Sequence, residues 1–267
     1  MAGNAGNYEK KEFSKSRRNI SLLLEYGFRK HTIHSMLEFD ITEARRMIHA
    51  EKEKTGRRIS FTGWVIKCVG QAMADNKELN AYRLGRRKIV VFDDVDISIP
   101  VERVTNEGAN TVAHIIRKAN EKSVTDITDE IRSVQSENVD ASTQLLGELN
   151  FTERLIMGAP LFIQKLMLRY FSRNGLMMKK YMGTVGVSSV GTLGKFPGWV
   201  IPLGTPAVMI LVGGITKKPA VIDNKIEIRE CLHITVTVDH DMVDGGPMVR
   251  FVDRLNELME GAFGLEE

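Results

Sequence analysis

The C-terminal third of the chain is built from apolar runs in which polar residues alternate, and this pattern constrains the fold more than any other feature. A long helical pattern closes the chain, with Met248, Phe251, Val252, Leu255 and Leu258 on one face. Four segments before it have the composition of strands: 184–194, 207–216, 219–230 and 232–240. The residues Asp223, Asn224 and Lys225 have the composition of a tight hairpin turn. The region therefore predicts a sheet covered by helix.

The first half of the chain mixes helical and extended patterns. We expect helices at 16–30, 45–53 and 59–76, a strand at 31–42, and two short strands joined by a turn at 88–104. The segment 111–136 predicts one helix or two. Residues 1–15 are polar and predict a flexible N-terminal arm, followed by a single domain over 16–267. The length of 267 residues is normal for a single large α/β (α+β) unit.

Composition excludes several classes of function. The chain has 267 residues, 43% of them hydrophobic, which is enough for one large core. A net charge of +3 gives no support for nucleic-acid binding. Cys68 and Cys231 lie in apolar runs and predict neither a disulfide framework nor a metal site. The N-terminus lacks the apolar core of a signal peptide, so we expect a cytoplasmic protein.

The segment 154–182 differs from the rest of the chain. It contains six basic residues and no Asp or Glu, and it is rich in Leu, Met, Phe and Tyr. Pro160 and the pair Asn174-Gly175 divide it, which predicts two short helices. Such a segment can pack on the body or on another subunit, lie on an anionic membrane surface, or help to bind an anionic ligand.

His240 follows the last strand pattern and is the first candidate for catalysis. Asp244 lies four residues later, and the Gly-Gly-Pro run that begins at Gly245 predicts a sharp change of direction. The preceding strand is half polar, as expected of a strand that borders a wet cavity. A neutral histidine is a suitable general base for a thiol.

These residues resemble the catalytic domain of the 2-oxo acid dehydrogenase acyltransferases, which share a fold with chloramphenicol acetyltransferase. His240-x-x-x-Asp244-Gly245 matches the HxxxDG motif of that family. TVGVSSVG at 184–191 is similar to a strand motif of the family, and IPLGTPAVMILVGGITKKPAV is similar to the segment after it. SRRNI, HTIHSMLEFDIT and NKELNA are similar to elements of its N-terminal half. The resemblance covers about residues 14–135 and 183–260, so the region at about 140–182 looks like an insertion.

The resemblance implies a mixed β-sheet covered by helices, in trimers whose active-site channel lies between subunits. His240 would deprotonate the thiol of coenzyme A or dihydrolipoamide, with no metal involved. Ser188, from another chain, would donate a hydrogen bond to the oxyanion, or Ser189 if the register shifts by one. Asp244 and Gly245 would fix the loop, Asp244 through an ion pair with Arg17.

If the segment 154–182 lies near this channel, we expect it to cap the channel mouth or the trimer surface. It would then admit small thiols such as coenzyme A and hinder a lipoyl domain.

Arg18 is the alternative partner for Asp244. The sequence also departs from the family pattern. The usual Asp-His-Arg is Asp-His-Asp here, so Asp239 and Asp241 flank His240. Nearby negative charge favours the protonated imidazole, which cannot accept a proton and so cannot act as a base. Ser189 replaces the asparagine of the strand motif, and the lipoyl and peripheral-subunit-binding domains have no counterpart.

Two functions follow. The first is an acyltransferase between coenzyme A and a thiol acceptor, with a lipoyl group on a separate protein as acceptor and a lipoyl-bearing or dehydrogenase protein as partner. The second is a catalytically silent scaffold or assembly protein, favoured by Asp241 and by the missing lipoyl domain. A metal hydrolase built on Asp-His-Asp is disfavoured, because such sites gather several histidines and aspartates from helices.

Overall fold

The computed structural model describes residues 6–13, 15–105, 108–136, 158–191 and 197–266. The N-terminal half contains α1 (Lys15–Phe28), β1 (Thr32–Asp40), α2 (Thr42–Thr55), α3 (Phe61–Asp75), η1 (Lys77–Leu79), β2 (Ala81–Leu84), β3 (Lys88–Val91), β4 (Ile97–Thr105), β5 (Gly108–Ile116) and α4 (Val124–Ser136). The C-terminal half contains α6 (Leu161–Phe171), α7 (Gly175–Met182), β6 (Val185–Ser189), β7 (Val208–Ile222), β8 (Lys225–Asp239) and α8 (Gly245–Glu260).

The main sheet is mixed and has the order β1-β8-β7-β6-β4-β5. The pairs β6–β7 and β4–β6 are parallel, whereas β1–β8, β7–β8 and β4–β5 are antiparallel. The hairpin β2–β3 forms a separate small sheet. The predicted mixed sheet with helices over it is confirmed.

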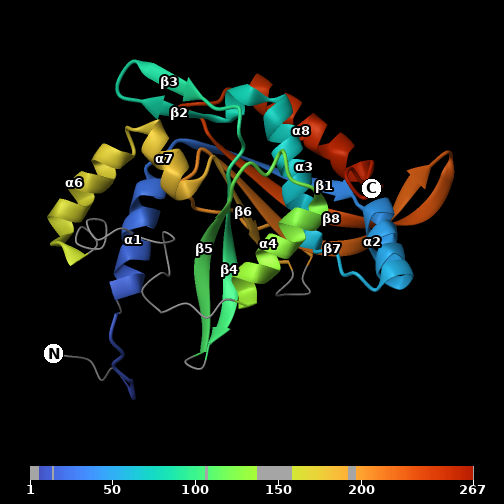
Figure 1. Ribbon diagram of the computed structural model, residues 1–267, viewed down its shortest axis with the longest axis horizontal. Coiled ribbons are helices and arrows are strands. Elements are labelled where there is room, and N and C mark those ends of the chain that lie inside the picture. The colour runs from blue at the N-terminus through green and yellow to red at the C-terminus, as the bar shows by residue number, and fades with distance from the viewer. Residues whose placement is uncertain (1–5, 14, 106–107, 137–157, 192–196, 267) are drawn as a thin grey trace.

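One face of the sheet carries the main core. Trp64 on α3, Phe251 on α8 and Ile127 on α4 are fully buried against Val187 and Ile234 of the sheet. The alternation of strand residues places these side chains on one face and Gly186 and Ser188 on the other. Figure 1 shows α3, α4 and α8 together, with α2 at the right edge, while α1, α7 and α6 lie at the left beneath the β2–β3 hairpin.

The C-terminal strands are longer and fewer than the sequence pattern predicts. The expected segments 207–216 and 219–230 do not form separate strands, because β7 continues through Pro219 to Ile222 and β8 begins at Lys225. The predicted turn between them is confirmed: Asp223 and Asn224 have φ of 48° and 62°, the left-handed pair of a tight hairpin. The hairpin tip is apolar and exposed.

Two other expectations were wrong in part. The strands expected within 88–104 exist, but β3 pairs with β2 and β4 pairs with β5 and β6, so they do not form one hairpin. The first part of 111–136 is strand β5, and only 124–136 is helical.

The basic segment forms two short helices, as expected. Pro160 precedes α6, and Asn174 caps α7 by accepting hydrogen bonds from the backbone N–H groups of Leu176 and Met177. None of the helices in the described part of the chain has the length and apolarity that crossing a bilayer requires.

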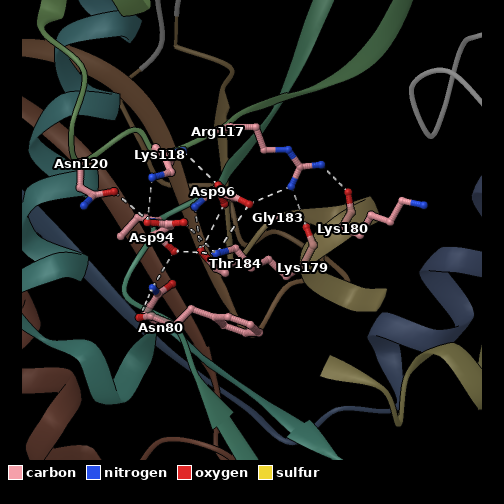
Figure 2. A network of polar contacts seen from close by, with 12 residues as sticks. Asn80, Asp94, Asp96, Arg117, Lys118, Asn120, Lys179, Lys180, Gly183 and Thr184 are labelled. Atoms are coloured by element: carbon pink, nitrogen blue, oxygen red, sulfur yellow. Dashed lines mark hydrogen bonds and ion pairs between the residues drawn. The ribbon is translucent and has the colours of Figure 1, made fainter. Parts of the chain in front are cut away.

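A buried carboxylate joins this segment to the sheet. Asp96, whose side chain is 5% exposed, accepts hydrogen bonds from Arg117 at 2.8 Å and from the backbone N–H of Lys118 at 3.0 Å. Its own carbonyl accepts from the backbone of Thr184 at 2.7 Å. Arg117 also donates to the carbonyls of Lys179 and Lys180 at the end of α7. Figure 2 shows these groups converging where β4, β5, β6 and α7 meet.

Gly183 lies at the centre of this junction and provides a test of it. Its φ is 70° and its ψ is −171°, a region open to glycine alone, and an added Cβ would lie 2.5 Å from the carbonyl oxygen of Asp96. Gly85 has the same φ of 70° and open space around it. We expect Gly183→Ala to reduce the free energy of unfolding by more than about 3 kcal/mol, and Gly85→Ala by only about 1 kcal/mol. Urea denaturation measures both, and equal losses would show that the contact with Asp96 is unimportant.

Candidate active site

His240 lies at the end of β8, where the chain leaves the sheet. Its backbone N–H donates a hydrogen bond to the carbonyl of His31 at 2.7 Å, which connects the turn to the residue just before β1. The side chain is 46% exposed, and its Nδ1 lies 3.9 Å from Oδ1 of Asp244. The imidazole is therefore held at a rim, accessible to a substrate, as the sequence predicts.

Asp244 and Gly245 stand at the start of α8. The Asp244 carboxylate is 90% exposed, and its ionic partner within the described residues of the chain is His240. The expected ion pair with Arg17 or Arg18 stays a prediction. A side chain at position 245 would meet nothing within 4 Å, so the single chain gives no steric reason for the glycine. The structural roles expected for these residues remain predictions.

A buried lysine, which sequence analysis did not identify, stabilises the turn that contains His240. Lys30 donates to the carbonyls of Thr205 and Pro206 at 2.7 and 3.0 Å, and its Nζ lies 3.3 Å from Oδ2 of Asp239. Burial lowers the pKa of Lys30, and the charge of Asp239 acts against that effect. The ammonium group holds the end of β8 against the loop before β7. No local sequence pattern signals it, because its partners lie far along the chain.

The second flanking carboxylate also has a partner. Asp241 Oδ1 lies 3.0 Å from Nδ1 of His31, and the Asp241 backbone donates to the Asp239 side chain at 3.2 Å. Both carboxylates that flank His240 in sequence are therefore paired with other basic side chains.

Ser188 lies on the sheet face opposite the main core. It lines a cavity of about 590 Å³ together with Leu23 of α1, His114 of β5 and Met209 of β7. Ser189, the expected alternative, points to the other face, where its hydroxyl is buried without a hydrogen-bond partner among the described residues. This register makes Ser188 the hydroxyl accessible from the cavity.

The chain does not bring His240 and Ser188 together. Ser188 pairs with Leu211, and Leu211 pairs with Thr235, five residues before His240. Strand geometry then separates the two residues by about 17 Å along β8 and about 10 Å across the sheet, or roughly 19 Å in all. A general base and an oxyanion donor must both lie within about 3 Å of the reacting group. These two residues cannot act on one substrate within a single chain.

A basic cavity of about 670 Å³ lies beside the His240 turn. Asp239 and Asp241 form one wall. The other walls carry a set of arginines and lysines from the residues just after α1, the β2–β3 hairpin and the turn between α6 and α7: Arg29, Lys30, Arg83, Arg86, Arg87, Lys88 and Arg173. Within the described residues no carboxylate pairs with Arg86, Arg87, Lys88 or Arg173. The cavity therefore suits an anionic group.

Comparison with known proteins places this geometry in a family. Residues 6–145 and 176–265 match the model of the 2-oxoacid dehydrogenases acyltransferase catalytic domain. The chain belongs to this family. The two matched segments leave out 146–175, which includes all of α6.

Relatives of known name are members of the same acyltransferase family. The lipoamide acyltransferase component of the branched-chain alpha-keto acid dehydrogenase complex of Bacillus subtilis is 25% identical over 231 residues, which is 85% of this chain and 46% of that protein. A mitochondrial dihydrolipoyllysine-residue succinyltransferase component of Saccharomyces cerevisiae is 26% identical over 211 residues, 78% of this chain and 37% of that protein. The chain thus spans less than half the length of these relatives.

Solved structures confirm the fold expected of the family. A probable dihydrolipoamide acetyltransferase from Listeria monocytogenes superimposes with a TM-score of 0.69 at 22% identity, over 97% of both chains. The cubic core of a pyruvate dehydrogenase complex gives 0.68 at 17% identity, over 97% of this chain and 93% of that one. Chloramphenicol acetyltransferase gives 0.50 at 14% identity, over 95% and 96%.

The Lys30–Asp239 pair provides a test of the support behind His240. Lys30→Met leaves a carboxylate that is 12% exposed without its cation, and breaking a buried pair costs about 3–5 kcal/mol. We expect that loss of unfolding free energy in Lys30→Met and a much smaller loss in the double variant Lys30→Met/Asp239→Asn. The exposed Lys52→Met is the control. Urea denaturation measures all three, and a single variant as stable as the control would contradict the pairing.

Proposed function

We propose that the chain is an acyltransferase that exchanges an acyl group between coenzyme A and a thiol acceptor. The dihydrolipoyl group of a separate protein is the acceptor that its relatives suggest, since they are lipoamide or dihydrolipoyllysine acyltransferase components. The observation that carries the proposal is the half-exposed His240 at the end of β8, with both flanking carboxylates paired to other groups.

The proposed reaction uses His240 as a general base. The imidazole removes the thiol proton, and the thiolate attacks the carbonyl carbon of the thioester. The tetrahedral oxyanion accepts a hydrogen bond from Ser188, an interaction that lowers the barrier by about 3 kcal/mol in comparable sites. Collapse expels the second thiolate, which takes the proton back from the imidazolium. Since Nδ1 faces Asp244, we assign the proton transfer to Nε2.

A related acyltransferase supports these assignments. In the dihydrolipoamide acetyltransferase of Azotobacter vinelandii, the roles of a serine, a histidine and an asparagine four positions after it have been investigated in the catalytic mechanism. This chain has Ser188, His240 and, four positions later, Asp244. That structure is 18% identical, with a TM-score of 0.69.

We also propose that the site is completed between subunits of a trimer or a multiple of three. The separation of His240 from Ser188 within one chain is the first support. The second is the hairpin tip of β7 and β8, where Val221, Ile226 and Ile228 are each more than 70% exposed. An apolar group of this kind on an isolated chain is typical of an interface.

Mixing two inactive variants tests three assignments together: His240 as the base, Ser188 as the oxyanion donor, and a site shared between subunits. We expect His240→Ala and Ser188→Ala each to reduce thioester exchange by at least about 100-fold without changing the melting temperature. Mixed oligomers, purified through a different tag on each variant, should regain part of the activity, because some interfaces then combine an intact His240 with an intact Ser188. The assay follows thiol release from a panel of acyl-coenzyme A thioesters, with free dihydrolipoamide as acceptor.

Three results would count against this proposal. Turnover by His240→Ala at the wild-type rate would eliminate the general-base role. Mixed oligomers as inactive as their parents would place the site within one chain. A wild-type protein that forms oligomers and exchanges no thioester of the panel would support the scaffold function instead.

The basic cavity is the proposed site for the phosphate groups of coenzyme A. We expect the double variant Arg86→Ser/Arg87→Ser to raise the KM for coenzyme A about tenfold while kcat and the KM for uncharged dihydrolipoamide stay unchanged. The variant Lys52→Ser/Lys54→Ser removes equal charge from α2 and is the control. If the KM for both thiols rises equally, the arginines do not recognise the phosphates.

A further inference from the structure

The helix α6 exposes apolar and basic side chains side by side. None of its residues is buried, and Phe162, Leu166 and Tyr170 are 72%, 67% and 63% exposed. Their spacing of four residues aligns them along one side of the helix. Lys165 and Arg169 form a second line beside them with the same spacing. The surface is therefore an apolar line bordered by a basic line, which we call the α6 surface.

The charge of this surface has little compensation. The segment 158–182 contains no Asp or Glu. Glu25 of α1 pairs with Lys165 at 3.1 Å, and it also pairs with Arg29 at 2.7 Å. Arg169 has no carboxylate partner among the described residues. Exposed apolar side chains beside a net positive charge favour a partner that is apolar and anionic together.

A groove between α1 and α6 combines the same two chemical properties. It has a volume of about 560 Å³. Leu22, Leu166 and Leu168 give it apolar walls, and Arg29 and Arg169 line it as well. Lys165 and Glu25 line it too, so its lining is apolar with three basic side chains against one carboxylate.

We propose that the α6 surface docks the protein on an anionic lipid membrane, with α6 parallel to the bilayer plane. Aromatic and leucine side chains enter the boundary between head groups and acyl chains, and lysine and arginine contact the anionic head groups. Eleven residues of α6 are too few to span a bilayer but suffice for an interfacial helix. The match to the family leaves this helix out, and the proposal is independent of acyl transfer.

Vesicle sedimentation tests the proposal on the intact chain. We expect the wild type to sediment with vesicles of phosphatidylcholine and phosphatidylglycerol, not with pure phosphatidylcholine vesicles, and to be released by salt. The variant Lys165→Ser/Arg169→Ser should bind on the order of tenfold more weakly, because each cation near an anionic surface adds to the binding free energy. Phe162→Ser/Leu166→Ser should lose a similar factor while its net charge stays the same.

The control removes the same charge from another part of the molecule. Lys52→Ser/Lys54→Ser changes α2, which lies at the opposite end of the long axis from α6 (Figure 1). It should bind the anionic vesicles as the wild type does. Circular dichroism and thioester exchange should be unchanged in all three variants, so failure of membrane docking is distinguishable from failure of the proposed enzymatic function.

Several outcomes would overturn the proposal. A wild type that does not bind anionic vesicles, or α6 variants that bind as tightly as it does, would refute membrane docking. An equal loss in the α2 control would show a dependence on net charge alone. If the α6 variants instead lower the mass seen in sedimentation velocity, the surface is an interface between copies of the chain.

Discussion

The buried carboxylate of Asp96 holds together the part of the sheet from which Ser188 projects. Removing a carboxylate from water is costly, and Arg117 together with the Lys118 backbone offsets that cost. The carbonyl of Asp96 at the same time binds the backbone of Thr184, one residue before β6 begins. Such a pair adds little stability compared with an apolar contact, but it fixes the register between β4 and β6. A slip of one residue would exchange the two faces of β6 and turn Ser189 toward the cavity.

The same junction attaches α7, which follows the helix α6 that the family match leaves out. Arg117 binds the last carbonyls of α7, and the carbonyl of Arg173 accepts a hydrogen bond from Gly85 of the β2–β3 turn at 2.7 Å. The chain from Arg173 to the end of α7 is therefore fixed to the sheet and to the β2–β3 hairpin, while α6 extends away from both (Figure 1). This arrangement lets Arg173, in the turn after α6, line the cavity beside the His240 turn and leaves α6 itself available to an outside partner.

Sequence patterns predicted the local features of the site and missed those that depend on distant contacts. The Gly-Gly-Pro run placed His240 at a rim, and the alternation around Ser188 placed it on a strand, because both signals lie within a few residues. The run from Thr111 to Ile116 was predicted as part of a helix, which is wrong: a short apolar run fits a strand equally well, and pairing with β4 decides for the strand. The prediction began a new strand at Pro219, but Pro219 lies within β7 and pairs with Ile228 in a two-stranded extension, where a missing N–H group is tolerated. Nothing near Lys30 indicates that its partners lie more than 170 residues away.

The charge environment of His240 is the feature for which the sequence and the structure lead to the most different expectations. The Asp-His-Asp run suggests an imidazole between two negative charges, a poor environment for a base. In the folded chain Asp239 lies 3.3 Å from the buried ammonium group of Lys30, and Asp241 lies 3.0 Å from Nδ1 of His31, so a cation meets the charge of Asp239 and an imidazole contacts Asp241. The carboxylate near the ring is that of Asp244, on the Nδ1 side, where it favours the tautomer that leaves Nε2 free to accept a proton. The proposed role of His240 as a base therefore rests on a fold in which both flanking carboxylates have partners of their own.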